Sequence, residues 1–332
     1  MAKKSKPPPP PTEPSHSAPP PPYFPFASYT AVVGVHTTLL IFAALFLPRT
    51  PDAYGLDFLK PHVDPTQLTS QDRPQHPFLE ALTRSPVATL AWVCAGAVVL
   101  QGWWGGWVRE WGIEWALRGV GLERRVEKTR VDERKYTNLR NAWLATGAAS
   151  LLLHVVLVLL GAPLLSHVWQ TYLLALLLCI LIVFPPAYTV GTPRDSVVAW
   201  LTWVRIFAEF SIRTPVERAM LYPALGALAG AWLGVIPIAL DWDRPWQAYP
   251  LPPALGALAG YILASIAALT ASAISFFAEE HLRSVREAAA GAEEHLRSVA
   301  AGVGATAKGS VNAKKDDVEG AEWTLSSKLL VL

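Results

Sequence analysis

Charged residues and cysteines are scarce in this sequence. Only 16% of the 332 residues are charged, 52% are hydrophobic and the mean hydropathy is +0.29, a balance that is unusual for a soluble globular protein. Both cysteines, Cys94 and Cys179, fall inside apolar segments, so the sequence supports neither a disulfide framework nor a thiolate metal site. The net charge of +2 is too small to suggest a nucleic-acid partner.

What the sequence does contain is a series of long apolar segments. A bilayer crossing requires about 20 residues, and a backbone inside hydrocarbon must satisfy its own hydrogen bonds by forming a helix. The sequence therefore predicts an all-α, polytopic membrane protein with six transmembrane helices. The predicted helices cover residues 28–47, 86–108, 141–161, 168–191, 219–240 and 254–277.

A shorter apolar segment, residues 196–212, is predicted to be an additional interfacial helix. It carries Arg205 and Glu209 on one helical face, and burying each of them at the bilayer centre would cost about 2.5 to 3.5 kcal/mol unless they pair or snorkel. Its two tryptophans suit the headgroup boundary. A seventh crossing remains the alternative.

The segments outside these helices predict the domains and the orientation. Residues 1–27 are proline-rich and predict a disordered cytosolic tail, and residues 28–277 form the predicted transmembrane domain. Residues 278–332 are predicted to be a cytosolic tail with an amphipathic helix, in which AEEHLRSV occurs twice. With six crossings, 23 Lys and Arg residues fall on the side of the termini and five on the other side, so the positive-inside rule predicts that both termini are cytosolic.

Two short polar turns would then face the opposite compartment. The first, DWDRPWQ at 241–247, combines two carboxylates, a guanidinium and two indoles: Asp241, Trp242, Asp243, Arg244 and Trp246. The arginine can bind a phosphate or carboxylate, and the tryptophans suit the headgroup zone. The turn predicts either contact with a partner or lipid headgroup, or simple anchoring. Two carboxylates alone support a cation site only weakly, so we predict no metal and no cofactor.

The second turn, GAPLLSHVWQ at residues 161–170, offers His167, Trp169 and Gln170. A lone histidine at a membrane boundary is more often a hydrogen-bonding turn residue than a catalyst, and no nucleophile accompanies it at a suggestive spacing. We therefore predict partner or headgroup contact here too, and no catalytic residue. Two further histidines, His36 and His154, lie inside predicted helices and are expected to hydrogen-bond between helices.

Five glycines mark predicted contacts between helices. They recur at a spacing of four on one face of the fifth and of the sixth predicted helix: Gly226, Gly230, Gly234, Gly256 and Gly260. Such faces let two backbones approach closely. We expect the two helices to pack on each other within the chain, although a partner subunit could also use these faces.

The two turns and the helices that flank them resemble one family. LLGAPLLSHVWQTYLLALLL at 159–178, together with GAWLGVIPIALDWDRPWQAYP at 230–250, is similar to the PIG-F family of glycosylphosphatidylinositol (GPI) anchor biosynthesis in its fungal form, and the resemblance extends over residues 28–277. It implies a non-catalytic, multi-pass subunit of the endoplasmic reticulum membrane that binds and stabilises large GPI ethanolamine-phosphate transferase subunits, PIG-O and PIG-G. The implied assembly is a hetero-oligomer that contacts membrane lipids, and its transferase moves ethanolamine phosphate onto mannoses of the GPI precursor.

Two other functions stay open from the residues alone. Histidines and glycine-rich faces inside the membrane also suit a lipid transporter or scramblase that handles a phospholipid or a GPI intermediate, although midplane charges and interrupted helices are few. An integral-membrane transferase that acts through the two turns is disfavoured by the missing nucleophile.

Overall fold

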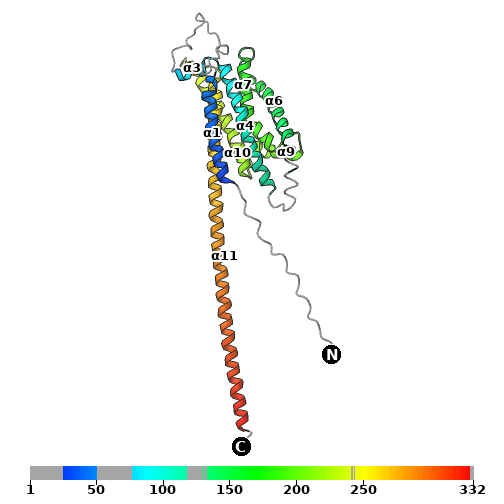
Figure 1. Cartoon of the computed structure of the whole chain (residues 1–332), viewed down its shortest axis with the longest axis vertical. Coiled ribbons are helices and arrows are strands. Elements are labelled where there is room, and N and C mark those ends of the chain that lie inside the picture. The colour runs from blue at the N-terminus through cyan, green and yellow to red at the C-terminus, as the bar shows by residue number, and fades with distance from the viewer. Residues whose placement is uncertain are drawn as a thin grey trace. The chain divides into compact units, whose positions relative to one another are not determined.

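The protein folds as helices throughout the part of the chain that the structure describes. The structure is a computed structural model that describes residues 25–50, 77–117, 129, 133–240, 242 and 244–329, with side chains as far as residue 300. Every regular element in these ranges is a helix, which confirms the predicted all-α fold (Figure 1). The chain divides into two compact units, Met1–Ser272 and Ala273–Leu332. All the site residues predicted from the sequence belong to the first unit.

Five helices are long and apolar enough to cross a membrane. They are α1 (Phe26–Phe46) with the short helix η1 (Leu47–Arg49), α4 (Pro86–Ala116), α6 (Lys135–Leu159), α10 (Pro215–Val235) with η6 (Ile236–Ala239), and α11 (Leu251–Leu329). α4 and α10 begin where they do because Ser85 and Thr214 cap backbone N–H groups of the first turn, and a proline follows each cap. Membrane-spanning helices are thus confirmed at five of the six predicted places.

The remaining predicted crossing, residues 168–191, is divided in two. α7 (Val168–Ile182) has 15 residues and α8 (Phe184–Thr189) has six. The helix breaks between them because Pro185 and Pro186 have no N–H group to donate to the preceding turn. Both pieces are largely buried against α4 and α6. Laid end to end they would measure about 33 Å, close to the hydrocarbon thickness of about 30 Å, so six crossings stay a prediction.

The segment predicted to be interfacial is a short helix followed by one irregular turn. α9 (Val197–Trp203) has seven residues, and the π-helical segment η5 (Val204–Ala208) has five. Together they are about 18 Å long, too short to cross a bilayer. Val197, Val198, Trp200 and Leu201 are exposed, as a helix lying at the membrane boundary requires.

Arg205, in η5, has a partner that the sequence did not indicate. Its guanidinium donates to both carboxylate oxygens of Glu217, at 2.6 and 3.0 Å, and to the carbonyl oxygen of Ser211 at 2.7 Å. Glu209, which shares a face with Arg205 in a regular helix, is exposed. The ion pair therefore ties η5 to the first turn of α10 instead of neutralising one face of its own helix.

The glycine faces of α10 and α11 meet each other within the first unit. A Cβ atom at Gly226 would overlap the carbonyl oxygen of Gly260, and a Cβ atom at Gly230 would overlap that of Gly256. At Gly234 the neighbour is the backbone of Pro252 and Pro253, with the Pro253 Cα 2.7 Å from such an atom. The two backbones are in direct contact, so these faces are occupied inside the chain.

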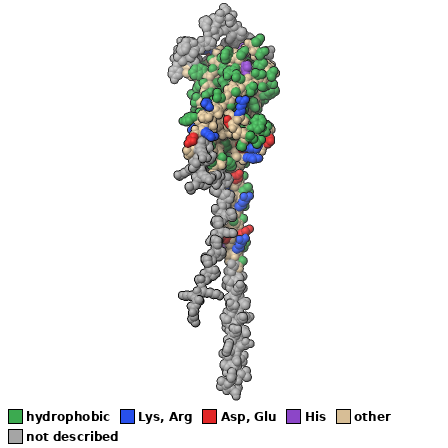
Figure 2. Space-filling view, turned by 90° about the vertical axis from the view of Figure 1, so that its right-hand side faces the viewer, with side chains coloured by type: hydrophobic (Ala, Val, Ile, Leu, Met, Phe, Trp, Pro, Cys, Tyr) green, Lys and Arg blue, Asp and Glu red, His purple; other side chains and the backbone are tan. Residues whose placement is uncertain are grey.

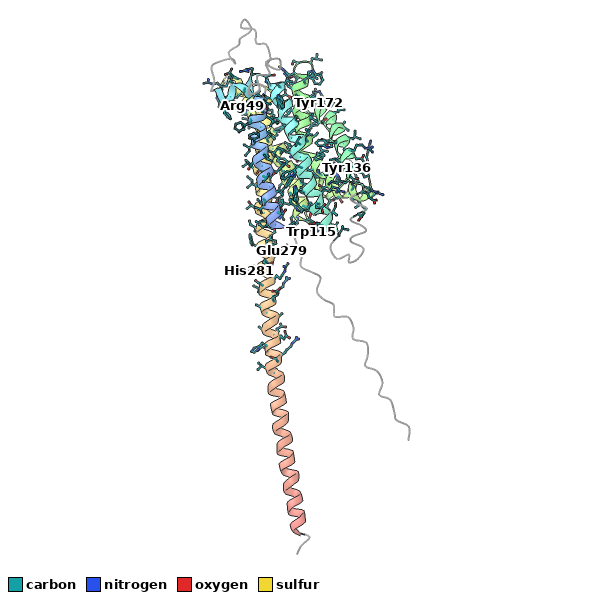
Figure 3. All side chains as sticks on the ribbon, viewed as in Figure 1. Arg49, Trp115, Tyr136, Tyr172, Glu279 and His281 are labelled. Atoms are coloured by element: carbon teal, nitrogen blue, oxygen red, sulfur yellow. The ribbon has the colours of Figure 1, made fainter. Side chains whose placement is uncertain are left out.

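The first unit has an apolar part and a more charged part. In Figure 2, hydrophobic side chains cover its upper part, and Lys, Arg, Asp and Glu side chains gather in its lower half. Figure 3 places Arg49 and Tyr172 at the upper end of the helix bundle and Trp115, near the end of α4, at the lower end. The charged end is thus the one that the positive-inside rule assigns to the cytosol, and the orientation itself stays a prediction.

Candidate functional site

The two predicted turns come together at the upper end of the bundle. The Thr171 hydroxyl, in the first turn of α7, lies 3.0 Å from the Tyr249 hydroxyl in the turn before α11. The His167 and Tyr249 rings are 6.5 Å apart between centroids, and His167 Nδ1 lies 3.1 Å from Gln170 Nε2. Tyr249 is the residue that joins the two turns. Burial raises the pKa of its phenol above the ordinary value, so it remains a neutral hydrogen-bonding group.

Gln247 holds the shape of the second turn. It lies in the short helix η7 (Pro245–Gln247), and its side chain is buried. Its Nε2 donates to the carbonyl oxygens of Pro237 and Leu240, at 2.6 and 2.7 Å, while its Oε1 accepts from the Arg244 backbone N–H at 2.8 Å. One amide thus satisfies three backbone groups where the chain leaves α10. This fixes the turn that presents Arg244.

The predicted contact residues fall into three groups. Asp241 and Asp243 lie outside the described residues. Trp169, Trp242 and Arg244 are exposed, and so is His167. Gln170 and Trp246 are half-buried, and the Trp246 ring lies 5.8 Å from that of Trp242. We call the four exposed side chains His167, Trp169, Trp242 and Arg244 the end surface.

A small helix that the sequence did not predict lies beside the second turn. α3 (Pro77–Thr83) packs against η7 and against η1. The Arg49 guanidinium in η1 lies over the Phe78 ring at 3.6 Å from its centroid and donates to the Phe78 carbonyl oxygen. This cation–π contact links the end of α1 to α3, and α3 in turn packs against the second turn. The signal in the sequence was weak, because only seven residues form the helix.

The two histidines inside the membrane helices contact their neighbours through their rings. His36 stacks on Trp104 of α4, with centroids 4.9 Å apart and planes at 8°, and its Nε2 has no hydrogen-bond partner among the described residues. His154 approaches Tyr172 of α7 edge-on at 6.2 Å, and its Nδ1 likewise lacks a partner in that part of the chain. The expected hydrogen bonds through these atoms are replaced by ring packing, because α4 and α7 present aromatic rings there.

The end surface has the chemistry of a contact site. An exposed guanidinium can bind a phosphate or carboxylate through two hydrogen bonds, and exposed indoles suit either the headgroup zone or the centre of a protein interface. Within the described residues, no group of three or more His, Cys, Asp or Glu side chains is placed to hold a metal ion. The hydrogen bonds of Gln247, Thr171 and Tyr249 serve to hold the turns together.

Fold and site together define a multi-pass helical membrane protein that presents an aromatic and cationic surface at one end of its bundle. Residues 75–269, more than half of the chain, match the GPI biosynthesis protein family Pig-F. The chain therefore belongs to the PIG-F family. The match begins just before α3 and includes both turns and all five glycines, whereas α1, which the resemblance included, lies outside it.

Individual relatives match a shorter part of the chain. One is named GPI ethanolamine phosphate transferase, stabilizing subunit, from Mus musculus, and is 38% identical over 111 residues, which are 33% of this chain and 48% of that protein. Its Homo sapiens counterpart is 37% identical over 109 residues, 33% of this chain and 47% of the relative. Glycosylphosphatidylinositol anchor biosynthesis protein 11 of Pyricularia oryzae is 39% identical over 118 residues, covering 36% and 41%. The chain thus spans about half the length of the relatives it matches. No solved structure matches it.

Proposed function

We propose that this protein is a non-catalytic membrane subunit that binds and stabilises a GPI ethanolamine-phosphate transferase in the endoplasmic reticulum. The observation that carries the proposal is the end surface, which exposes two indoles and a guanidinium on turns held by Gln247 and Tyr249. Tryptophan and arginine are enriched among the residues that contribute most of the binding energy at protein interfaces. The names of the mouse and human relatives supply the kind of partner.

The compartment in which the end surface would meet its partner depends on the expected orientation of the chain. With both termini cytosolic, the end surface faces the lumen at the headgroup level, where a partner's membrane domain or a lipid phosphate is accessible. The partners would be large subunits of the PIG-O and PIG-G type, in a hetero-oligomer. The partner would carry out the transfer of ethanolamine phosphate to the mannoses of the GPI precursor, and this chain would supply no catalytic residue.

The experiment is affinity purification of the full chain in mild detergent, followed by identification of stoichiometric companions. We expect a large transferase subunit at one-to-one with the wild type. Arg244→Ala should reduce its recovery about tenfold, the loss expected from removing a charged hydrogen-bonding group at an interface, while the abundance of the chain stays unchanged. Arg194→Ala, at an exposed arginine near the other end of the bundle, is the matched control. Equal recovery of the transferase subunit with both variants, or an equal loss of the chain and of the transferase subunit, would show that Arg244 has a structural role only and does not bind the partner.

The alternative function, lipid transport, is favoured by one observation, the interruption between α7 and α8. Interrupted helices are typical of transporters, where they line a substrate site. Here, however, the break is packed against α4 and α6, and Phe184, Pro185 and Pro186 beside it are buried. Lipid movement by the purified chain alone in vesicles would support this alternative over the accessory subunit.

A further inference from the structure

The second half of α10 exposes a row of large apolar side chains. They recur at spacings of three and four and are all exposed: Leu225, Leu228, Trp232 and Ile236, the last of which begins η6. Residues three and four apart share one face of a helix, and this face points away from the glycines that contact α11. We call these four side chains the outer face of α10.

Trp232 lies near the middle of the membrane-spanning part of α10 and η6. The uncharged part of this span runs from Ala219, just after Arg218, to Ala239. Measured along the helix axis, Trp232 lies about 20 Å from Ala219 and about 13 Å from Ala239. It is therefore within about 4 Å of the midpoint of the segment that hydrocarbon has to cover. It is also 70% exposed.

An exposed tryptophan at this depth is poorly suited to lipid. The indole N–H is a donor for which hydrocarbon offers no acceptor, and tryptophans of membrane proteins accordingly gather at the headgroup level. The other exposed tryptophans of the described residues lie in the two turns, in α9 or within two helical turns of Arg109: Trp169, Trp242, Trp200, Trp103 and Trp107. Trp232 is the one among them that lies farthest from a helix end or a charged residue, so its exposure favours contact with protein.

The outer face also leads along the chain into the end surface. η6 ends at Ala239, and Trp242 of the end surface follows three residues later. A partner that binds the end surface therefore meets α10 as the helix that leads directly into its binding site. The glycine face of α10 is already filled by α11, which leaves the outer face for such a contact.

We propose that a membrane-spanning helix of the transferase partner packs along the outer face of α10, with Trp232 at the centre of the contact. This inference rests on the proposed function and names the part of the partner that is bound within the membrane. The Trp232 N–H would donate to a backbone carbonyl or hydroxyl oxygen of that helix. Leu225, Leu228 and Ile236 would surround the indole with apolar contacts, as is typical of a residue that contributes much of the binding energy.

The test is affinity purification of the full chain in mild detergent, with recovery of the transferase subunit as the measurement. Trp232→Leu keeps an apolar side chain that lipid accepts but removes the ring and its N–H. It should lower recovery about tenfold, as expected for a central tryptophan of an interface, while the melting temperature of the chain alone stays unchanged. Trp200→Leu, the same change at a tryptophan that is 55% exposed outside the outer face, is the matched control and should recover the subunit as the wild type does.

A photo-crosslinking residue in place of Leu228 shows which molecule covers the outer face in the purified complex. We expect it to crosslink to the transferase subunit. Crosslinks to lipid alone or to a second copy of this chain would overturn the proposal, and so would equal recovery with Trp232→Leu and Trp200→Leu. The proposed function itself fails if the wild type recovers no transferase subunit, whereas this inference fails if the wild type and Trp232→Leu recover it equally.

Discussion

The contact between α10 and α11 allows one prediction to be worked out in full. An exposed Gly→Ala change inside a helix normally stabilises it, by about 1 kcal/mol. At Gly230 the new Cβ would overlap the Gly256 carbonyl oxygen, and the Gly260 Cα would lie 3.1 Å from it. These neighbours are backbone atoms, which cannot rotate away, so the helices must separate. Overpacking of this kind costs about 1–3 kcal/mol, which reverses the sign of the effect.

The assay is thermal unfolding of the purified chain in detergent, with Gly147→Ala in α6 as the control, because a Cβ at Gly147 meets no atom within 4 Å. We expect Gly230→Ala to melt below the wild type and Gly147→Ala at or above it. Gly256→Ala should resemble Gly230→Ala, and the double variant should lose less than the sum, because one separation of the helices relieves both overlaps. A Gly230→Ala protein as stable as the Gly147→Ala control would refute the close contact.

Two further predictions concern polar side chains that hold the fold together. Arg205→Ala leaves the Glu217 carboxylate, which is 12% exposed, without its charged partner, and should lower the free energy of unfolding by up to about 3 kcal/mol. In denaturant titrations, the double variant Arg205→Ala, Glu217→Ala should lose less stability than the sum of the two single variants. Additive losses would exclude the ion pair as a stabilising unit. Gln247→Ala leaves the carbonyl groups of Pro237 and Leu240 without their donor and should destabilise the turn locally by about 1–3 kcal/mol. Amide hydrogen exchange should become faster in residues 244–250 and change little in α6. Unchanged exchange in residues 244–250 would show that the turn holds its shape without the Gln247 amide.

The sequence predicts the helices well because their cause is local. A run of apolar residues long enough to cross hydrocarbon must be helical, whatever its neighbours are. The glycine spacing likewise locates a close backbone approach, since residues four apart share a face. Pro185 and Pro186 were visible as interruptions, but whether they would end a helix or only bend it depends on packing against α4 and α6.

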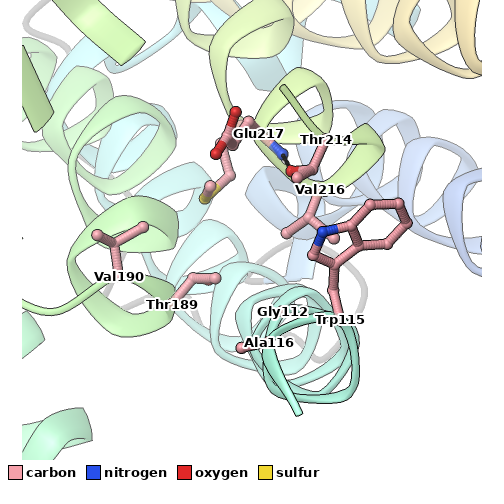
Figure 4. Close-up of a pocket in the computed structure, with 9 residues that line it drawn as sticks. Gly112, Trp115, Ala116, Thr189, Val190, Thr214, Val216 and Glu217 are labelled. Carbon is pink, nitrogen blue, oxygen red and sulfur yellow. Dashed lines mark hydrogen bonds between the residues drawn. The ribbon is translucent and has the colours of Figure 1, made fainter. Parts of the chain in front are cut away.

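The polar contacts were harder to predict, because each depends on how the chain reverses direction. Arg205 reaches Glu217 only because residues 209–214 bring α10 back beside η5, and a helical spacing rule suggested Glu209 instead. Gln247 matters because the carbonyl groups of Pro237, in η6, and of Leu240, just after it, accept hydrogen bonds from its side chain. A pocket lined by the ends of α4 and α8 and by the start of α10 likewise brings together residues that are distant in the sequence (Figure 4). In each case the sequence contains the residues but does not show which of them lie close together in the folded chain.

The use of the glycines within the chain bears on where a partner can bind. Faces of small residues let membrane helices of different subunits approach closely, and from the sequence a partner subunit was the alternative to packing within the chain. In the first unit, however, the backbones of α10 and α11 already fill those faces, and a partner helix could reach them only by separating the two. The proposed partner contact therefore has to come from side chains that project outward. Trp242 at 52% exposure projects from the same turn as Arg244, and Trp169 at 70% projects from the neighbouring turn, so the end surface combines apolar area with a cationic group.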